Sequence, residues 1–249
     1  MSQIPVALQL YTVRDETAKD FIGTLRRVAA MGYAGVEFAG YGDLPAAELK
    51  QVIADLGLQP ASSHVGLEAL EAGEALDYLN AIGCPFVAVP WMPQELRENM
   101  AGWKSVAKRM NAVGEKCKER GITLTYHNHD FEFQKFCNQY GLDILYRNSD
   151  PGLVQAELDL YWIKHGSADP VAYIKKYAGR VPLLHCKDMA EDGSFAEVGN
   201  GTLDWPAIFA AATLAGTQWY IVEQDTCTRP TLESAEISFN YLKKMGVVG

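Results

Sequence analysis

The feature that most constrains this chain is a regular alternation of short apolar strands with amphipathic helices along its length. A glycine stands just past most of the predicted helices, as expected for a residue that ends a helix in the left-handed conformation. These glycines are Gly32, Gly57, Gly83, Gly121, Gly179 and Gly216. The alternation predicts successive βα units, which assemble into a parallel sheet.

Eight strands and eight helices can be placed in this alternation. The predicted strands are Ile4–Leu10, Tyr33–Phe38, Leu58–His64, Pro85–Val89, Ile122–His129, Val154–Asp159, Val181–Cys186 and Trp219–Glu223. The predicted helices are Lys19–Met31, Ala46–Leu56, Leu67–Ile82, Gly102–Arg120, Tyr140–Asn148, Pro170–Tyr177, a helix capped by Asp204 that runs to Leu214, and Leu232–Met245.

Eight βα units in 249 residues predict an α/β fold, a closed (β/α)₈ TIM barrel. The rival is an open, doubly wound sheet, which should carry a glycine-rich turn after its first strand. Here the segment Leu10–Arg14 contains no glycine. Because no linker or change in composition interrupts the pattern, residues 1–249 are expected to form a single domain.

Composition excludes several classes of function. The net charge of -9 disfavours binding to nucleic acid, which needs clustered Lys and Arg. No apolar run is long enough to span a membrane, and no secretory signal is visible, so we expect a cytoplasmic protein. The cysteines lack metal-binding or disulfide spacing and are expected to be reduced thiols: Cys84, Cys117, Cys137, Cys186 and Cys227.

Polar side chains collect at the predicted strand ends, where the active site of such a barrel lies. His127 and His129 share one face of the fifth strand, because side chains two apart in a strand point the same way. Four of the five histidines fall at strand ends, and His165 is expected on the rim. The other polar or aromatic positions at these ends are Gln9, Tyr11, Glu37, Trp91, Asp159, Lys187, Asp188, Glu223 and Asp225.

The ends of the fifth to eighth strands each offer one metal ligand. They are His127, Asp159, His185 and Glu223. Two imidazoles with two carboxylates suit one divalent ion such as Mn²⁺, Zn²⁺, Co²⁺ or Fe²⁺ better than Ca²⁺, which prefers oxygen ligands. Two alternatives stay open: Asp159 could cap a loop, and His185 could be a hydrogen-bonded core histidine. Glu223 follows an apolar strand and would be costly to bury unpaired.

With these residues placed, the sequence resembles the xylose isomerase-like TIM barrels, the broad sugar phosphate isomerase/epimerase superfamily. The resemblance spans nearly the whole chain. It is carried by Leu8–Arg14, Gly32–Glu37, Tyr126–His129, Glu157–Trp162, His185–Asp188 and Val198–Trp205.

The resemblance implies one divalent metal at the ends of strands five to eight, with Asp159, His185 and Glu223 in matching positions. Many members carry Glu-Asn-His at the end of strand five, where this chain reads His127-Asn128-His129. His127 therefore takes the place of a glutamate that is both a ligand and an acid/base group. A ligand role survives this change, but the two-glutamate proton relay does not carry over intact.

The expected chemistry is removal of the proton α to a sugar carbonyl by a metal-dependent carbohydrate isomerase or epimerase. Glu223 is the expected base, and His129, Glu132 or Lys187 could supply the second proton or bind a hydroxyl. The alternative is a keto-sugar lyase or dehydratase, which acts on inososes or cleaves 3-keto glycosides after the same first step.

The expected partner is a small sugar or cyclitol. Trp91 and Trp162 could stack on a sugar ring, and Glu37 and His64 could bind its hydroxyls; nothing supports a phosphate group on the substrate. A DNA repair endonuclease would need more metal ligands and a basic surface, and a non-catalytic sugar-binding barrel stays open. The sequence also leaves the oligomeric state open, a homo-oligomer included.

Overall fold

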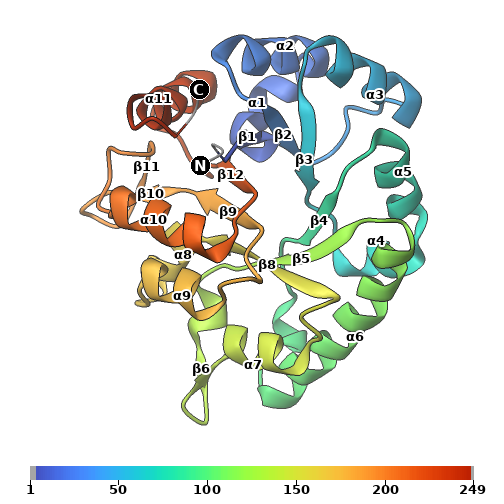
Figure 1. Ribbon diagram of the computed structural model, residues 1–249, viewed down its shortest axis with the longest axis vertical. Coiled ribbons are helices and arrows are strands. Elements are labelled where there is room, and N and C mark those ends of the chain that lie inside the picture. Colours follow the sequence, from blue (N-terminus) through green and yellow to red (C-terminus); the bar gives the residue numbers. More distant parts are fainter. Residues whose placement is uncertain (1–3, 248–249) are drawn as a thin grey trace.

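A computed structural model describes residues 4–247 of the chain as a barrel of parallel strands surrounded by helices (Figure 1). The eight barrel strands are hydrogen-bonded in the order β3-β2-β1-β12-β9-β8-β5-β4. Their bounds are β1 Val6–Gln9, β2 Gly35–Phe38, β3 Gln59–Ser63, β4 Phe86–Val89, β5 Thr123–His127, β8 Val154–Asp159, β9 Leu183–Cys186 and β12 Trp219–Val222. The predicted (β/α)₈ barrel is confirmed.

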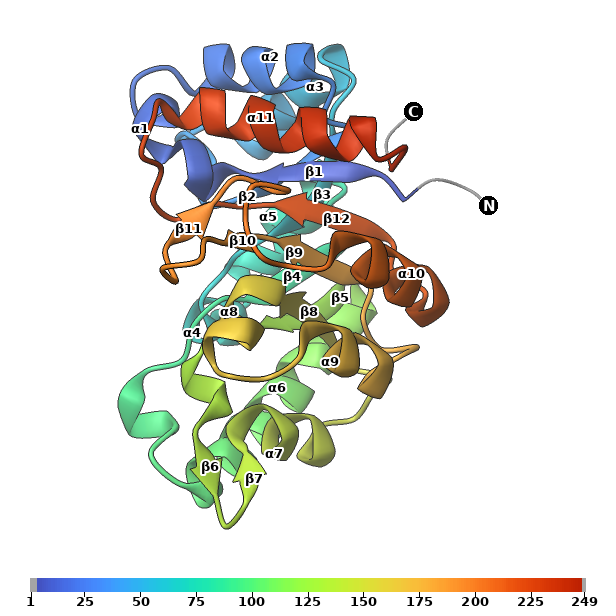
Figure 2. The same ribbon diagram turned by 90° about the vertical axis from the view of Figure 1, so that its left-hand side faces the viewer.

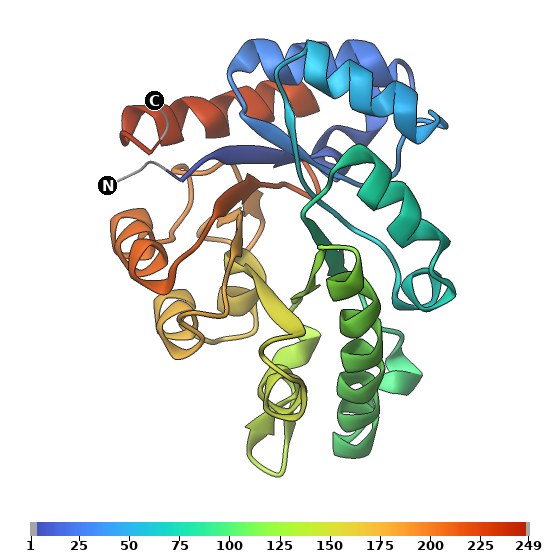
Figure 3. The ribbon, with the colours of Figure 1, turned by 45° about the vertical axis from the view of Figure 1, so that its right-hand side comes forward.

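Helices cover the outside of the barrel, and the first and last βα units meet, so that red and blue segments lie side by side in Figure 3. The α-helices are α1 Arg14–Thr17, α2 Phe21–Met31, α3 Ala46–Asp55, α4 Leu67–Ala72, α5 Glu74–Ile82, α6 Met100–Glu119, α7 Gly141–Asn148, α8 Leu160–His165, α9 Pro170–Lys176, α10 Trp205–Ala215 and α11 Thr231–Lys244. Short 3₁₀ segments are η1 Leu10–Val13, η2 Gln94–Leu96 and η3 Phe131–Phe133.

The barrel closes between β3 and β4 through very little pairing. One isolated parallel bridge joins His64 to Ala88, and the backbone N–H of Val65 donates to the carbonyl of Ala88 at 2.9 Å. The other seven neighbouring pairs of barrel strands form ladders of several residues, and the ladder between β2 and β3 has one register shift between Val36 and Glu37. The joint between β3 and β4 is therefore the least bonded part of the ring.

Two boundaries differ from the sequence prediction. The predicted helix Leu67–Ile82 is two helices, α4 and α5, because Gly73 between them has a left-handed φ of 96° that ends the first helix. The predicted strand Ile122–His129 ends at His127, so that His129 lies in the following loop. The eight predicted strands and the other helices are present with shifts of a few residues at their ends.

The loops at the carboxyl ends of the strands carry short extra elements. These are the hairpins β6 Lys135–Phe136 with β7 Gln139–Tyr140, and β10 Asp188–Met189 with β11 Phe195–Ala196. Figure 2 shows β10 and β11 at the end of the barrel opposite the two chain termini. Within residues 4–247, no helix has the length and apolar character that crossing a membrane requires.

The interior of the barrel changes from apolar to polar along its axis. With the carboxyl ends of the strands taken as the top of the barrel, its lower part holds a separate apolar cluster that includes Ala7, Leu183 and Ile221. The residues two positions further along the same strands are Gln9, His185 and Glu223. Because side chains alternate across a strand, these polar groups also face the interior and form its upper layer. The candidate site is thus built on rigid strands above a packed apolar floor.

Candidate active site and metal centre

The ends of β5, β8, β9 and β12 bring the four predicted metal ligands together. One donor atom from each of His127, Asp159, His185 and Glu223 lies within 4.8 Å of the others, and all four side chains are buried. Nδ1 of His185 is 3.0 Å from Oε2 of Glu223, and Nε2 of His127 is 3.4 Å from Oδ2 of Asp159. We call these four residues the outer cluster.

The donor set of the outer cluster fits a divalent metal. His127 is only 2% exposed, yet neither of its ring nitrogens has a hydrogen-bond partner among the described residues. A buried polar atom without a partner is costly, and a metal ion would satisfy it. Two imidazole nitrogens and two carboxylate oxygens suit Mn²⁺, Zn²⁺, Co²⁺ or Fe²⁺.

The backbone around Asp159 fixes its carboxylate. Oδ1 of Asp159 accepts from the backbone N–H of Trp162 at 2.9 Å and caps α8, which leaves Oδ2 to face His127. The side chain of Asn128 bonds both backbone groups of Asp159, at 3.0 and 3.3 Å, and ties the ends of β5 and β8 together. The capping role that the sequence left open is therefore present, and it uses only one of the two oxygens.

Lys187 is the only cation that contacts the outer cluster among the described residues. Its Nζ is 2.7 Å from Oε2 of Glu223, 3.0 Å from Oδ2 of Asp159 and 3.0 Å from Oδ1 of Asp225. Burial alone lowers the pKa of Lys187, but these carboxylates raise it above its usual value. Lys187 is therefore an ammonium at neutral pH, which can donate a proton or a hydrogen bond but does not act as a base.

The carboxylates of the outer cluster are ionised at neutral pH. Burial alone raises the pKa of Glu223, but Lys187 and His185 lower it well below its usual value. Burial likewise raises the pKa of Asp159, and Lys187 and His127 bring it down to about 2. Glu223 is thus in the protonation state that a proton acceptor needs.

Below the outer cluster, a second group of ionisable side chains surrounds the other nitrogen of His185. Nε2 of His185 is 2.7 Å from Oε2 of Glu37 and 3.0 Å from Oε1 of Glu157. Nε2 of His64 lies 3.1 Å and 2.7 Å from the same two oxygens. Gln9 donates to Glu37 at 2.7 Å. We call Glu37, His64, Glu157 and Gln9 the inner cluster.

The inner cluster contains the residue that sequence reasoning missed. The sequence places Glu157 only within a family motif, whereas in the structure it is fully buried and faces the barrel interior. The signal that could have found it is the alternation of β8, because Glu157 is two residues before Asp159 on the same strand. Glu157 also belongs, with His64, His127 and His185, to a second set of donor atoms within 4.8 Å of one another.

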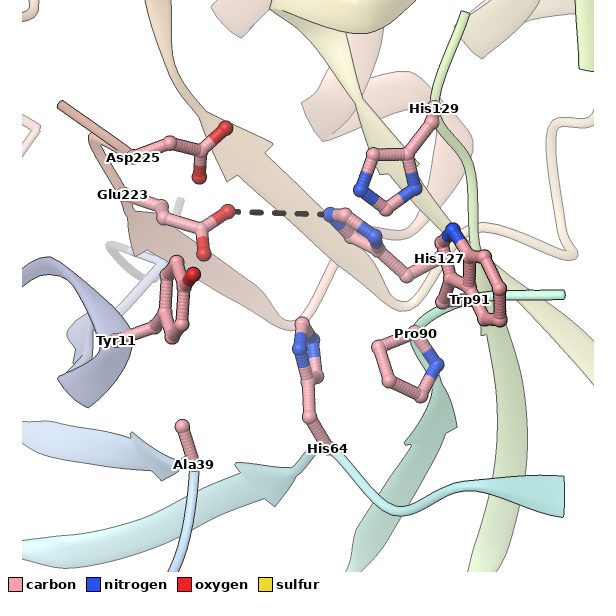
Figure 4. Close-up of a pocket in the computed structure, with 9 residues that line it drawn as sticks. All are labelled: Tyr11, Ala39, His64, Pro90, Trp91, His127, His129, Glu223 and Asp225. Atoms are coloured by element: carbon pink, nitrogen blue, oxygen red, sulfur yellow. Dashed lines mark ion pairs between the residues drawn. The ribbon is translucent and has the colours of Figure 1, made fainter. Parts of the chain in front are cut away.

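A pocket of about 480 Å³ opens directly above the outer cluster. Figure 4 shows Glu223 and Asp225 on one wall and His127, His129 and Trp91 on the other. Tyr11 and Trp91 both line this pocket and are 44% and 52% exposed, so they offer aromatic surface to a ligand. The remaining lining residues are Ala39, His64 and Pro90.

The predicted substrate residues divide into two groups. His64 and Trp91 line the pocket, whereas Glu37, Glu132 and Trp162 do not. The carboxylate of Glu132 accepts from the hydroxyl of Tyr126 at 2.7 Å and from the backbone N–H of His129 at 2.8 Å, and its burial raises its pKa to about 8. Glu132 therefore holds the loop after β5 in place.

The ring of His129 is held by aromatic neighbours. It stacks on Phe131 with 5.4 Å between centroids and packs against Trp162 at 5.3 Å. The guanidinium of Arg97 covers the other side of Phe131, 3.8 Å from its centroid. Burial, His127 and Lys187 lower the pKa of His129 to about 2, so its imidazole is neutral.

Asp188 organises the loop between β9 and α10. It is fully buried, and its carboxylate accepts from the indole N–H of Trp205 at 2.7 Å and from four backbone N–H groups. A carboxylate with this many donors is a fixed structural anchor. Asp188 thereby holds the chain directly after Lys187.

Comparison with known proteins agrees with this geometry. The sequence profile of the xylose isomerase-like TIM barrel family matches residues 25–245, and the chain belongs to that family. The inosose dehydratase of Geobacillus kaustophilus is 24% identical over 89% of this chain and 86% of its own length. The inosose dehydratase of Clostridium perfringens is 25% identical over 69% of this chain and 68% of its own.

Solved structures give the same assignment. A sugar phosphate isomerase/epimerase from Parabacteroides distasonis superposes with a TM-score of 0.90 at 28% identity, over 100% of this chain and 96% of that one. An L-ribulose 3-epimerase covers 99% of this chain and 95% of its own with a TM-score of 0.70, but at 18% identity it supports the fold alone. The family resemblance in the sequence is therefore confirmed, and the family is one of enzymes.

Proposed function

We propose that this protein is a metal-dependent enzyme that removes the proton α to the carbonyl of an uncharged keto sugar or keto cyclitol. The observation that carries this proposal is the convergence of His127, Asp159, His185 and Glu223 beneath the pocket, with Glu223 also forming part of the pocket wall. A divalent ion held by these four side chains would supply Lewis-acid stabilisation of negative charge on the substrate oxygens.

The pocket favours an uncharged substrate. None of its lining residues is Lys or Arg. Lys187, the cation beside it, is already neutralised by Asp159, Glu223 and Asp225. A phosphate or carboxylate group would therefore meet an acidic wall without a free counter-charge, whereas hydroxyl groups can donate to that wall.

In the proposed reaction Glu223 accepts the substrate proton. His129 stands on the opposite wall of the pocket in Figure 4, where its neutral imidazole can form a hydrogen bond with a substrate hydroxyl. Return of the proton at a new carbon or face gives an isomer or an epimer. This is the reaction that the superfamily resemblance favours.

A second outcome is elimination of a group β to the carbonyl, as in a dehydratase or lyase. Two observations favour it. The curated relatives above are inosose dehydratases. In addition, β5 ends in His127 where many members have an acid/base glutamate. Glu223 is therefore the one carboxylate of the outer cluster that lines the pocket. Elimination needs a single base, which Glu223 supplies, together with an acid at the leaving group.

The test measures proton removal and elimination in wild type and in the variant Glu223→Gln. Purified protein loaded with Mn²⁺ is incubated with keto sugars and inososes in D₂O and followed by NMR and mass spectrometry. Deuterium at a carbon α to the carbonyl reports proton removal, and loss of mass reports elimination. Glu223→Gln should lower the rate by about 10²–10⁴-fold, the usual contribution of a general base.

Asp192→Asn, on the exposed turn between β10 and β11, is the matched control and should keep the wild-type rate. The proposal fails if wild-type protein binds no divalent metal, or if Glu223→Gln exchanges the substrate proton as fast as wild type.

A further inference from the structure

A smaller cavity of about 180 Å³ lies next to the main pocket, and the two cavities share Trp91. The smaller one, which we call the side cavity, is formed by the start of α4 and by the loop after β4. Pockets that bury drug-sized ligands run from about 300 to 1,000 Å³, and one sugar ring is smaller than such ligands. The two cavities together therefore hold more than one ring.

Trp91 has the surroundings of a contact residue for a ligand. Its indole is 52% exposed, and among the described residues it has no side-chain hydrogen bond and no aromatic neighbour. Trp103 and Trp205, in contrast, are fully buried in the core. An aromatic ring without a structural partner, placed between two cavities, offers apolar area and an N–H group to a ligand.

The chemistry of the side cavity selects for an uncharged ligand with an apolar face. Leu67 and Met92 are buried apolar residues in its wall. The guanidinium of Arg109 is not available to an anion, because it forms a bidentate pair with Glu71 at 2.7 and 2.8 Å. Glu68 is exposed, and its carboxylate has no hydrogen-bond partner among the described residues. This carboxylate can therefore accept a hydrogen bond from a hydroxyl group of a ligand.

We propose that the side cavity binds the uncharged aglycone of a glycoside whose keto ring lies in the main pocket. This inference rests on the proposed function for the placement of the ring, and it narrows the substrate class from free keto sugars and cyclitols to glycosides. The aglycone packs on the indole of Trp91 and against Leu67 and Met92. The glycosidic bond then crosses the boundary between the cavities.

Gly66 gives a way to close the side cavity alone. It lines the side cavity but not the main pocket, and a Cβ built on it meets no atom within 4 Å. Its φ of -61° and ψ of 145° suit any residue. A leucine at this position of the cavity wall therefore causes no clash at Cβ and no backbone strain, and Gly66→Leu is designed to narrow the side cavity. Gly66→Ser is a matched small variant that keeps a good helix N-cap.

The experiment compares 4-nitrophenyl and methyl 3-keto-β-D-glucopyranoside on Mn²⁺-loaded protein. Binding is measured by calorimetry and proton removal by NMR in D₂O. We expect wild type and Gly66→Ser to bind the nitrophenyl glycoside about tenfold more tightly than the methyl glycoside, the size of one good aromatic contact. Gly66→Leu and Trp91→Ala should abolish this preference, and Gly66→Leu should leave binding of the methyl glycoside unchanged.

Equal binding of the two glycosides by wild type, or a preference that survives Gly66→Leu with an unchanged thermal midpoint, would overturn the proposal. The two readouts separate the two hypotheses. If the nitrophenyl preference follows Gly66 and Trp91 but no keto sugar exchanges a proton, the side cavity stands and the enzymatic proposal fails. If a keto sugar exchanges its proton but wild type shows no preference for the nitrophenyl glycoside, the enzymatic proposal stands and the side-cavity proposal fails.

Discussion

The two sides of the His185 ring meet different surroundings. On the Nδ1 side, the outer cluster contains buried nitrogens of His127 that have no hydrogen-bond partner. On the Nε2 side, the inner cluster pairs two carboxylates with two imidazoles at 2.7 to 3.1 Å. In the inner cluster, Glu37 and Glu157 each use one oxygen in these pairs and keep the other oxygen without a partner, whereas the ring of His127 has no partner at either nitrogen. A ring without any partner is better suited to binding a ligand than a carboxylate that is already paired through one oxygen. The His185 imidazole thus takes part in a largely paired group on one side and in the proposed binding group on the other.

This difference defines the tautomer that metal binding needs. A histidine that binds metal through one nitrogen usually donates its other N–H to a carboxylate or carbonyl, which fixes the ring and raises its basicity. Glu37 and Glu157 are placed to accept from Nε2–H of His185, which leaves Nδ1 for the metal. The inner cluster would therefore support the outer one by orienting its ligand.

The largest expected effect comes from His185→Gln, because this change affects both clusters. Glu37 and Glu157 would lose a shared buried partner, so the free energy of unfolding should fall by about 3–5 kcal/mol. Metal binding should be lost in the same variant. Urea unfolding with chelator present and calorimetric titration with Mn²⁺ measure the two effects. His165→Gln is the control, since His165 is 44% exposed and should change the unfolding free energy by less than about 0.5 kcal/mol.

His64 of the inner cluster and Asp159 of the outer cluster should lose their stabilisation at opposite ends of the pH range in metal-free protein. Burial lowers the pKa of His64 but Glu37 and Glu157 raise it from 6.5 to about 10, so its stabilisation is complete below pH 6.5 and disappears as the pH rises toward 10. The pKa of Asp159 falls from 3.8 to about 2, so its stabilisation of about 2 kcal/mol is complete above pH 3.8 and disappears as the pH falls toward 2.

Unfolding curves of metal-free wild type, His64→Gln and Asp159→Asn across this range test the prediction. Asp159→Asn should flatten the acid side and keep the loss toward pH 10. His64→Gln should remove that alkaline loss, and it should also change the acid side, because His64 lowers the pKa of Glu37. Identical pH dependence in the three proteins would show that the two clusters do not act as separate units.

Glu157→Gln should weaken Mn²⁺ binding by about 10–100-fold, the usual effect of losing a partner that orients a metal ligand. Asp159→Asn removes a proposed ligand and should weaken it further. Competition with a chelator measures the Mn²⁺ affinity of both variants. A smaller loss of affinity in Glu157→Gln than in Asp159→Asn would identify Glu157 as a residue that orients a ligand and Asp159 as a ligand. An affinity that Glu157→Gln leaves at the wild-type value would mean that Glu157 does not orient His185.

The smallest effect on metal binding is expected for Gln9→Met, which removes the hydrogen bond to Glu37 at 2.7 Å and the one that Gln9 accepts from the backbone N–H of Tyr11 at 3.0 Å. Loss of the hydrogen bond to the charged Glu37 should lower the free energy of unfolding by about 1.5–3 kcal/mol, and loss of the bond to Tyr11 by about 1 kcal/mol more, with Mn²⁺ affinity changed less than in Glu157→Gln. Thermal melts and the same chelator competition measure both quantities. A larger loss of metal affinity for Gln9→Met than for Glu157→Gln would reverse the assigned roles.

The sequence predicted the barrel and the convergence of the outer cluster because both follow from short-range rules. Strand and helix alternation defines the fold, and parallel strands bring their carboxyl ends to one edge. The prediction therefore placed His127, Asp159, His185 and Glu223 together, as the structure does. The break at Gly73 was missed because a glycine inside an apolar helical pattern can also be tolerated.

The inner cluster and the buried Glu132 were harder to predict for a physical reason. Glu157 lies one layer below the strand ends, so its site is defined by the depth of the barrel interior and not by a position in a loop. Glu132 is turned away from the pocket because η3 folds it back onto Tyr126. The positions of Glu157 and Glu132 both depend on contacts between segments that are distant in the sequence, and a periodic pattern of residue types does not reveal such contacts.

The sparse joint between β3 and β4 has a mechanical consequence. Where a closed ring of strands is least bonded, small forces produce the largest displacement. His64 directly follows β3 on one side of this joint, and Trp91 follows β4 on the other. A slight spreading of these two strands would thus alter the width of both the pocket and the side cavity, so amide exchange at Val65 should be faster than at paired residues of β5.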